Sequence, residues 1–188
     1  MYDFYNDLNI NNIHDLICMI VWFPGRIPKA AFCLWLAVRE RLYTQDRWFN
    51  FDPSIRCYLC NTQMKDHNHL FFNCPISNQI WRLVQSKCGI HVLQRSWTNT
   101  IEWLSMEWKI DNLTYQSWKL SLAVTVYNIW LERNSRLHCQ KANGEIQITE
   151  KIYEMIIMKL SSLKGLPEST NNRRVATTWN LPVSIFDK

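Results

Sequence analysis

Glycine and proline are scarce in this chain, which has four glycines and six prolines among its 188 residues. A β-sandwich needs many tight turns built from these residues, so their scarcity favours helices. The chain also lacks an Asp-Asp pair, and its sixteen acidic residues form no recognisable endonuclease or RNase H carboxylate cluster. Polymerase chemistry needs paired carboxylates that hold two metal ions. The sequence therefore predicts a helical protein that has no catalytic activity on its own.

Long hydrophobic runs are absent as well. The longest run extends only from Leu16 to Phe23, whereas a membrane-spanning helix needs about 20 apolar residues. The chain starts Met1-Tyr-Asp-Phe-Tyr-Asn-Asp, with acidic residues where a secretory signal peptide has basic ones. We therefore expect a soluble, intracellular protein with no membrane partner.

Charge of neither sign dominates the chain. Its 21 Lys and Arg residues against 16 Asp and Glu residues give a net charge of +5, without a basic tail or a dense basic stripe. This charge permits a polyanionic partner but does not require one. Hydrophobic residues make up 47% of the chain, and it has ten tryptophans. Such a chain can bury a substantial core.

Four potential metal ligands are close together in the sequence, namely Cys57, Cys60, His69 and Cys74. Structural Zn²⁺ takes four thiolate or imidazole ligands in a tetrahedron, and a Cys₃His set completes that shell. The Cys-x-x-Cys spacing lets one tight turn present two thiols, and His69 and Cys74 can meet through a short turn or helix start. We therefore predict a structural zinc site. A catalytic zinc would keep one position open for water.

Other uses of these cysteines remain open at this point. A disulfide requires an oxidising compartment, which the acidic start of the chain does not suggest. A redox Cys-x-x-Cys usually lies where a strand enters a helix, whereas this one follows the turn sequence Asp52-Pro53-Ser54. A degraded site is a further alternative.

His67 is a second candidate imidazole ligand. The step from His69 to Cys74 matches the ending of the retroviral-type zinc knuckle, so we prefer His69. His67 is then expected at the surface or behind the ligands, although the sequence does not exclude that it replaces His69.

Apolar residues that recur every three or four positions predict a series of helices. We expect them over about 29–41, 45–49, 75–88, 99–108, 112–139 and 149–163. In the first helix, the expected buried face carries Phe32, Trp35, Leu36 and Val38. We expect Trp81 to pack over the zinc loop.

These elements predict a mainly α fold, a small helical domain with an inserted Cys-Cys-His-Cys zinc loop. The expected organisation is a lead-in segment over 1–23, a zinc-binding domain with flanking helices over 24–90, a helical C-terminal region packing on it over 91–165, and a mostly irregular tail over 166–188. Trp179 and Leu181 are the tail residues expected to dock back on the helices.

Several blocks of the sequence carry a family resemblance. In order, they are Ile27-Pro28-Lys29-x-x-Phe32-x-x-Trp35-Leu36, Arg41-Leu42-x-Thr44-x-Asp46-Arg47, Cys57-x-x-Cys60, Asn68-His69-Leu70-Phe71-Phe72-x-Cys74-Pro75 and Ile80-Trp81. Together they resemble the reverse-transcriptase zinc-binding domain of plant LINE-type (non-LTR) retrotransposons, which lies in the C-terminal region of the element's polyprotein. The resemblance implies Cys57, Cys60, His69 and Cys74 as zinc ligands. One departure is Lys65, where the family often has Glu.

The resemblance implies a module that assists nucleic-acid binding or supports the polymerase. Our candidates for contacts with RNA or single-stranded DNA are Arg56, Tyr58, Lys65, Arg39, Arg41 and Arg47. Phe71 and Phe72 can stack on bases in principle, but we expect them in the core because small zinc loops need packing. The alternatives are a protein-interaction module that docks on a polymerase or another protein, and a nonfunctional fragment. A retroelement origin is compatible with the nucleus.

Overall fold

Helices form all the regular structure of the described residues. The computed structural model describes residues 17–44, 56–62, 66–90, 96–106 and 113–187, and no strand occurs in these ranges. The elements are α3 (Pro28–Val38), the π-helical turn η2 (His69–Asn73), α4 (Pro75–Lys87), α5 (Trp97–Met106), α6 (Leu113–His138), α7 (Glu145–Ser161), α8 (Thr170–Thr178) and the 3₁₀ turn η3 (Val183–Ile185). The predicted mainly α fold is confirmed.

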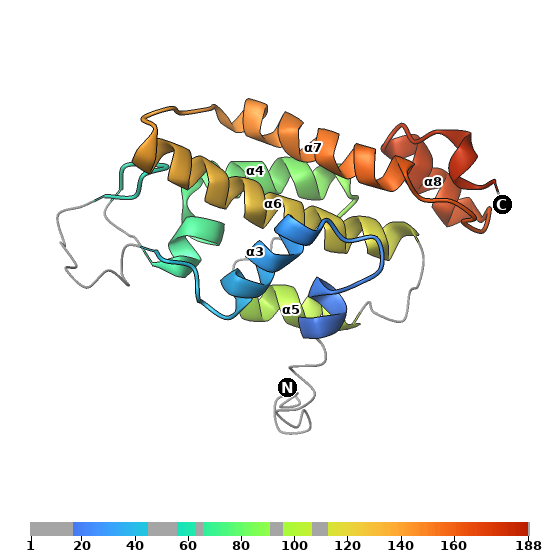
Figure 1. Cartoon of the computed structure of the whole chain (residues 1–188), viewed down its shortest axis with the longest axis horizontal. Helices are drawn as coiled ribbons and strands as arrows, with labels where there is room; N and C mark the ends of the chain where they lie inside the picture. The colour runs from blue at the N-terminus through green and yellow to red at the C-terminus, as the bar shows by residue number, and fades with distance from the viewer. Residues whose placement is uncertain (1–16, 45–55, 63–65, 91–95, 107–112, 188) are drawn as a thin grey trace, which may run out of the picture.

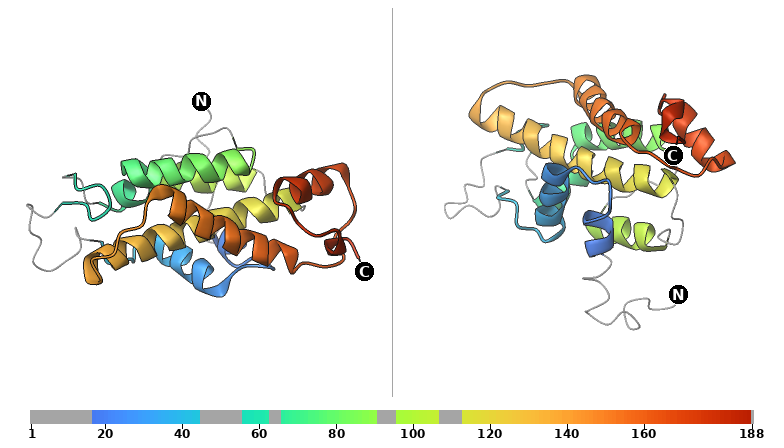
Figure 2. Two further views of the ribbon diagram at one scale, coloured as in Figure 1. Left: turned by 90° about the horizontal axis from the view of Figure 1, so that it is seen from above. Right: turned by 45° about the vertical axis from the view of Figure 1, so that its right-hand side comes forward.

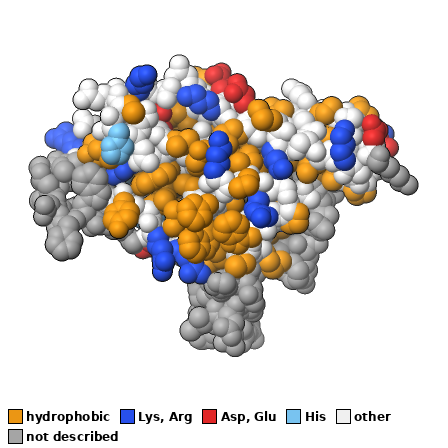
Figure 3. Space-filling view, in the orientation of Figure 1, with side chains coloured by type: hydrophobic (Ala, Val, Ile, Leu, Met, Phe, Trp, Pro, Cys, Tyr) orange, Lys and Arg blue, Asp and Glu red, His pale blue; other side chains and the backbone are white. Residues whose placement is uncertain are grey.

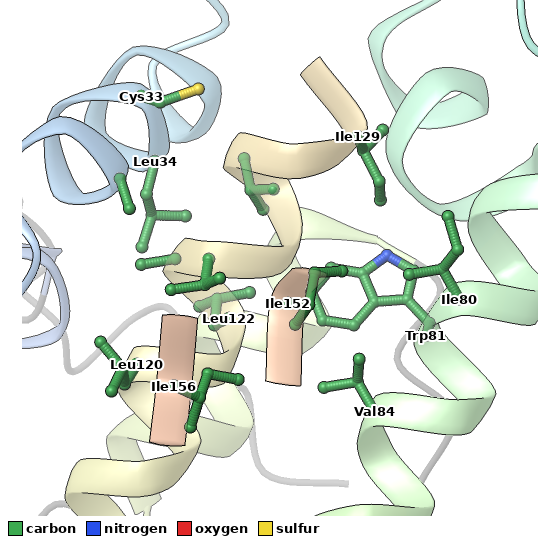
Figure 4. Close-up of a cluster of buried hydrophobic side chains, with 14 of the residues drawn as sticks. Cys33, Leu34, Ile80, Trp81, Val84, Leu120, Leu122, Ile129, Ile152 and Ile156 are labelled. Atoms are coloured by element: carbon green, nitrogen blue, oxygen red, sulfur yellow. The ribbon is translucent and has the colours of Figure 1, made fainter. Parts of the chain in front are cut away.

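The long helix α6 lies at the centre of the fold. It packs against α3, α4, α7 and α8, and α4, α6 and α7 extend along the long axis of the molecule (Figures 1 and 2). The core around α6 takes Leu34 from α3, Trp81 from α4 and Ile152 from α7 (Figure 4). Because its partners lie on several sides, α6 is apolar around much of its circumference.

The buried face of α3 is not the expected one. Ala30, Ala31, Cys33, Leu34 and Ala37 are buried. Phe32, which we predicted to be buried, is 52% exposed, and Trp35, Leu36 and Val38 are only partly covered. The prediction was wrong for Phe32 and only partly right for the other three, because it followed the largest side chains. The alanines instead allow α3 to pack closely on α6.

The C-terminal part also differs from the prediction. Helix α7 begins at Glu145, four residues before the expected start. The N–H of Gly144 donates to Oε1 of Gln147 at 3.1 Å, and the hydroxyl of Thr149 donates to the Glu145 carbonyl inside the helix. This local capping explains the earlier start.

The tail is helical over Thr170–Thr178 rather than mostly irregular. Ser169 caps α8 by accepting a hydrogen bond from the Asn172 N–H. The Asn172 side chain in turn accepts a hydrogen bond from the Leu113 N–H at the start of α6. Trp179 is 1% exposed and packs edge-on against Tyr153, so its expected docking is confirmed. The Ser169 cap, the Asn172 hydrogen bond and the buried side chains of Val175, Ala176 and Trp179 hold this otherwise polar segment in place.

Other predicted elements agree with the structure or fall outside its description. The bounds of α4 and α6 are within two residues of the predicted ones. The short helix expected over 45–49 lies outside the described residues. Within the described ranges, none of the helices combines the length and the apolar character needed to cross a membrane.

Candidate metal centre

The four predicted ligands converge at the end of the molecule opposite α8. Their donor atoms, three sulfurs and one ring nitrogen, all lie within 4.8 Å of one another. The Sγ atom of Cys60 is 3.3 Å from Nε2 of His69. Around a tetrahedral zinc ion, with Zn–S of about 2.3 Å and Zn–N of about 2.0 Å, neighbouring donors are about 3.5–3.8 Å apart. The cluster is close to this geometry and could hold one metal ion, and its sulfur and nitrogen donors favour zinc over Mg²⁺ or Ca²⁺, which take oxygen ligands.

A tight turn presents the first two ligands. The N–H of Asn61 donates to the Cys57 carbonyl at 2.7 Å, and the N–H of Cys57 donates to the Thr62 carbonyl at 2.8 Å. Asn61 closes the turn with a φ of +58°, a conformation that asparagine tolerates better than most residues. The turn places Cys57 and Cys60 on the same side of the chain.

A π-helical turn presents the other two ligands. In η2 the N–H of Cys74 donates to the carbonyl of His69 at 2.7 Å, which closes a turn five residues wide. A π turn joins residues i and i+5, so it brings His69 next to Cys74. The Asp66 carboxylate accepts a hydrogen bond from the N–H of His69 at 2.6 Å and fixes the start of the turn. Pro75 then begins α4 directly after the last ligand.

The ligand side chains also influence one another's protonation. The Cys74 thiol donates to the Cys57 sulfur, which lowers the pKa of Cys57 despite burial, and His69 adds to this lowering. The same hydrogen bond to Cys57 raises the pKa of Cys74, and burial raises it further. The hydrogen bond with Cys57 also raises the pKa of His69. The cluster thus favours a thiolate, which is the form of cysteine that binds metals.

His67 lies outside this cluster, in the core. It is 4% exposed, and its Nδ1 accepts a hydrogen bond from Nε1 of Trp97 at 2.8 Å. Its ring packs on Phe71 with 4.9 Å between centroids. A surface position for His67 was therefore wrong, and the described histidine that faces the cysteine donors is His69.

Phe71 and Phe72 belong to the hydrophobic core against which the zinc loop packs. They are 0% and 2% exposed, as expected for core residues. Trp81 of α4 donates from Nε1 to the Phe71 carbonyl at 2.6 Å and stacks against Phe72, so the predicted packing of Trp81 on the loop is confirmed. Neither phenylalanine is available to stack on a base.

A buried polar network ties the loop to α6, and sequence reasoning missed it. Nη1 of Arg136 donates to the carbonyl of Leu59 at 2.6 Å, and Nε of Arg136 pairs with Glu132 at 2.8 Å. Glu132 also accepts two hydrogen bonds from Asn143, after the end of α6. The spacing of Glu132 and Arg136 indicates only a pair on one helix face. No local sequence pattern predicts the hydrogen bond from Arg136 to Leu59, because the two residues are 77 positions apart.

Arg133 makes the second contact between α6 and the loop. Its guanidinium lies 5.0 Å from the ring centre of Trp130 and 5.6 Å from that of Tyr58. Arg133 and Trp130 therefore form a cation–π pair three positions apart on α6. Tyr58, one of our candidates for base stacking, is half-buried and is engaged by Arg133.

The remaining nucleic-acid candidates are distributed over two regions. Arg56 is exposed directly before the first ligand, and Arg39 and Arg41 are exposed at the end of α3. Lys65 and Arg47 lie outside the described residues. The exposed candidates among the described residues are therefore Arg56 beside Cys57, and Arg39 and Arg41 at the end of α3.

The fold and the site define a helical protein with a Cys₃His centre that can hold a metal ion. Residues 1–81 match the family described as zinc-binding in reverse transcriptase, and the match includes all four candidate ligands. Comparison with curated proteins and with solved structures gave no match.

Proposed function

We propose that this chain is a non-catalytic zinc-binding module, derived from a retrotransposon reverse transcriptase, that assists the binding of RNA or single-stranded DNA. The observation that carries the proposal is the convergence of Cys57, Cys60, His69 and Cys74 on one point, within residues that match a zinc-binding family. These residues would hold Zn²⁺ in a structural role, because four protein donors leave no position for water or substrate. The sequence blocks around the site support an origin in the C-terminal region of a plant LINE-type polyprotein, and such an origin suits the nucleus.

Charge and exposure support a nucleic-acid partner. The chain carries a net charge of +5, and Arg56 lies exposed beside Cys57. Phosphate contacts with arginine side chains dominate non-specific affinity for nucleic acids. The metal would contribute by fixing the loop that carries Arg56 and Tyr58 against α6.

A salt titration tests this proposal. The zinc-loaded full chain is titrated against labelled single-stranded RNA and DNA at several salt concentrations. We expect micromolar or tighter binding at low salt, with the logarithm of the binding constant falling by about 0.7 per phosphate contact per tenfold rise in salt. Absence of binding at low salt would refute the nucleic-acid role. Zinc-depleted protein is the matched control for the contribution of the metal.

A protein-interaction role is the second candidate. It is favoured by the exposed hydrophobic side chains before and within α3, which include Met19, Trp22 and Phe32, because such patches mark interfaces. This role predicts association with a polymerase region that is insensitive to added RNA. A nonfunctional fragment would instead give heterogeneous material whose folding does not respond to chelators.

A further inference from the structure

The solvent-facing side of α3 carries aromatic and basic side chains together. Phe32 and Trp35 are stacked, with 5.8 Å between ring centroids and 23° between their planes. The guanidinium of Arg39 lies 5.1 Å from the ring centre of Trp35. These three residues follow helical spacing and lie opposite the buried alanines of α3. Figure 3 shows hydrophobic side chains gathered over α3 and the segment before it, with Lys and Arg side chains around them.

The chain extends this face beyond the end of the helix. Glu40, with a φ of +51°, ends α3, and the buried Leu42 anchors the next residues. Arg41 and Tyr43 flank Leu42, and Tyr43 is 73% exposed. With Leu36 these residues line an open hollow of about 410 Å³. We call Phe32, Trp35, Arg39, Arg41 and Tyr43 the aromatic–basic surface.

Charge complementarity indicates the kind of partner. Residues 17–44 contain the basic residues Arg26, Lys29, Arg39 and Arg41 but Glu40 as the one acidic residue. A surface that combines exposed rings with an excess of cations suits a partner that offers flat π faces and negative charge at every unit. Single-stranded nucleic acid has both.

We propose that the aromatic–basic surface binds single-stranded RNA or DNA. Bases stack on Phe32 and Tyr43 beside the existing Trp35–Arg39 pair, and Arg39 and Arg41 contact the phosphates. Stacking of this kind tolerates any sequence, because every base has a π face. This inference rests on the proposed nucleic-acid role and places it on the aromatic–basic surface, which contains none of the four candidate metal ligands.

Variants of exposed residues test the surface. The zinc-loaded full chain and the double variant Phe32→Ala/Tyr43→Ala are titrated by fluorescence anisotropy against oligouridine and oligothymidine of about 20 nucleotides. We expect the double variant to lose at least about tenfold in affinity, since one stacked base contributes about 5- to 150-fold. Arg39→Ala should reduce the salt slope by about 0.7. The matched controls are Met158→Ala, equally exposed on α7 at 74%, and Lys151→Ala, also exposed on α7; both should bind like the unmodified chain.

The outcomes separate this inference from the proposed function. If the unmodified chain binds and the surface variants retain its affinity while Arg56→Ala loses it, the α3 site is refuted but the nucleic-acid role stands. If the unmodified chain does not bind at low salt, both are refuted. If the double variant converts a self-associated or polymerase-bound form to a free monomer without changing RNA affinity, the surface is a protein interface. Circular dichroism confirms folding, and Arg39→Ala gives an independent test if the double variant unfolds.

Discussion

At the scale of single residues, the zinc site depends on four donors that the sequence places within one short stretch. Cys57, Cys60, His69 and Cys74 could be predicted because ligand spacing is a local property and the donors need only two turns to converge. The position of His67 could not be predicted, because its partner Trp97 is 30 positions away. Local spacing therefore predicted the donor cluster that the structure brings together, and tertiary packing distinguishes the two histidines.

The ligand set predicts the effect of removing one sulfur. Cys60→Ser should lose stoichiometric zinc, because a neutral hydroxyl replaces a thiolate in the tetrahedral shell. Elemental analysis of the purified protein measures the metal content. Cys139→Ser is the matched control, since Cys139 is exposed and lies outside the cluster. Retention of one zinc per chain in Cys60→Ser would mean that the ligand set is wrong.

The two histidines should separate metal binding from stability. His69→Ala should lose the metal. His67→Ala should keep it but lower the free energy of unfolding by about 1–3 kcal/mol, because the indole N–H of Trp97 loses its buried acceptor. Zinc stoichiometry and urea unfolding of both variants provide the comparison. Loss of zinc from His67→Ala together with its retention in His69→Ala would reverse the assignment.

At the scale of elements, helix α6 joins the zinc loop to the rest of the molecule through Glu132 and Arg136. Sequence periodicity predicted α6 and its bounds, because a long run of apolar residues at helical spacing is a strong signal. Periodicity also predicted helix α3 but not its buried face, where the alanines are fully buried and Phe32 is exposed. Periodicity identifies a helix, but which of two faces is buried depends on the room that the neighbouring helix leaves.

The Glu132 network predicts a pH dependence of stability. Burial raises the pKa of Glu132, but hydrogen bonds from Asn143 and Arg136 outweigh it, so the pKa in the folded protein lies below 4.5. The folded state then binds fewer protons than the unfolded state between these two pKa values. The stabilisation is therefore complete above about pH 4.5 and is lost as the pH falls through the lower, folded-state pKa.

Replacing Glu132 tests this dependence. Glu132→Gln should lower the free energy of unfolding by about 1–3 kcal/mol at pH 7, because hydrogen bonds to a buried charge are replaced by neutral ones. The difference from the unmodified chain should shrink in acid. Urea unfolding at pH 7 and at acidic pH measures both. If the difference in free energy of unfolding between Glu132→Gln and the unmodified chain is the same at both pH values, the charge of the Glu132 carboxylate does not stabilise the fold.

At the scale of the whole molecule, the zinc loop and the helical core differ in what holds them together. The core around α6 joins α3, α4 and α7 through apolar side chains (Figure 4). The loop over 56–62 buries Cys57 and Leu59 against this core and is further held by Arg136 and Arg133 and by the candidate ligands. The sequence predicted this division as a small helical domain with an inserted zinc loop. It did not predict the C-terminal helix α8, whose anchor to α6 through Asn172 is non-local.

Removal of the metal should therefore act on one part of the molecule. Structural zinc contributes on the order of 10–16 kcal/mol of apparent binding free energy in finger peptides. A chelator should abolish hydrogen-exchange protection in residues 56–62 and in η2, while α6 and α7 remain protected and the far-ultraviolet circular dichroism changes little. Global unfolding on chelation would contradict an independent helical core.

The π turn η2 has a consequence for the length of this part of the chain. The turn uses five positions for little more than one revolution, so Cys74 lies on the same side of the chain as His69. Inserting one alanine after the exposed Asn73 would place Cys74 six positions after His69 and carry it about 100° further round the axis. All four donors would still be present, yet Cys74 would point away from the other three. We expect this insertion to abolish zinc binding as completely as the loss of a sulfur, with elemental analysis as the measurement. Deletion of Asn73, which leaves the i to i+4 spacing of an α-helical turn, should instead keep Cys74 beside His69 and retain the metal. Zinc retention in the insertion variant would mean that the register between His69 and Cys74 can slip freely.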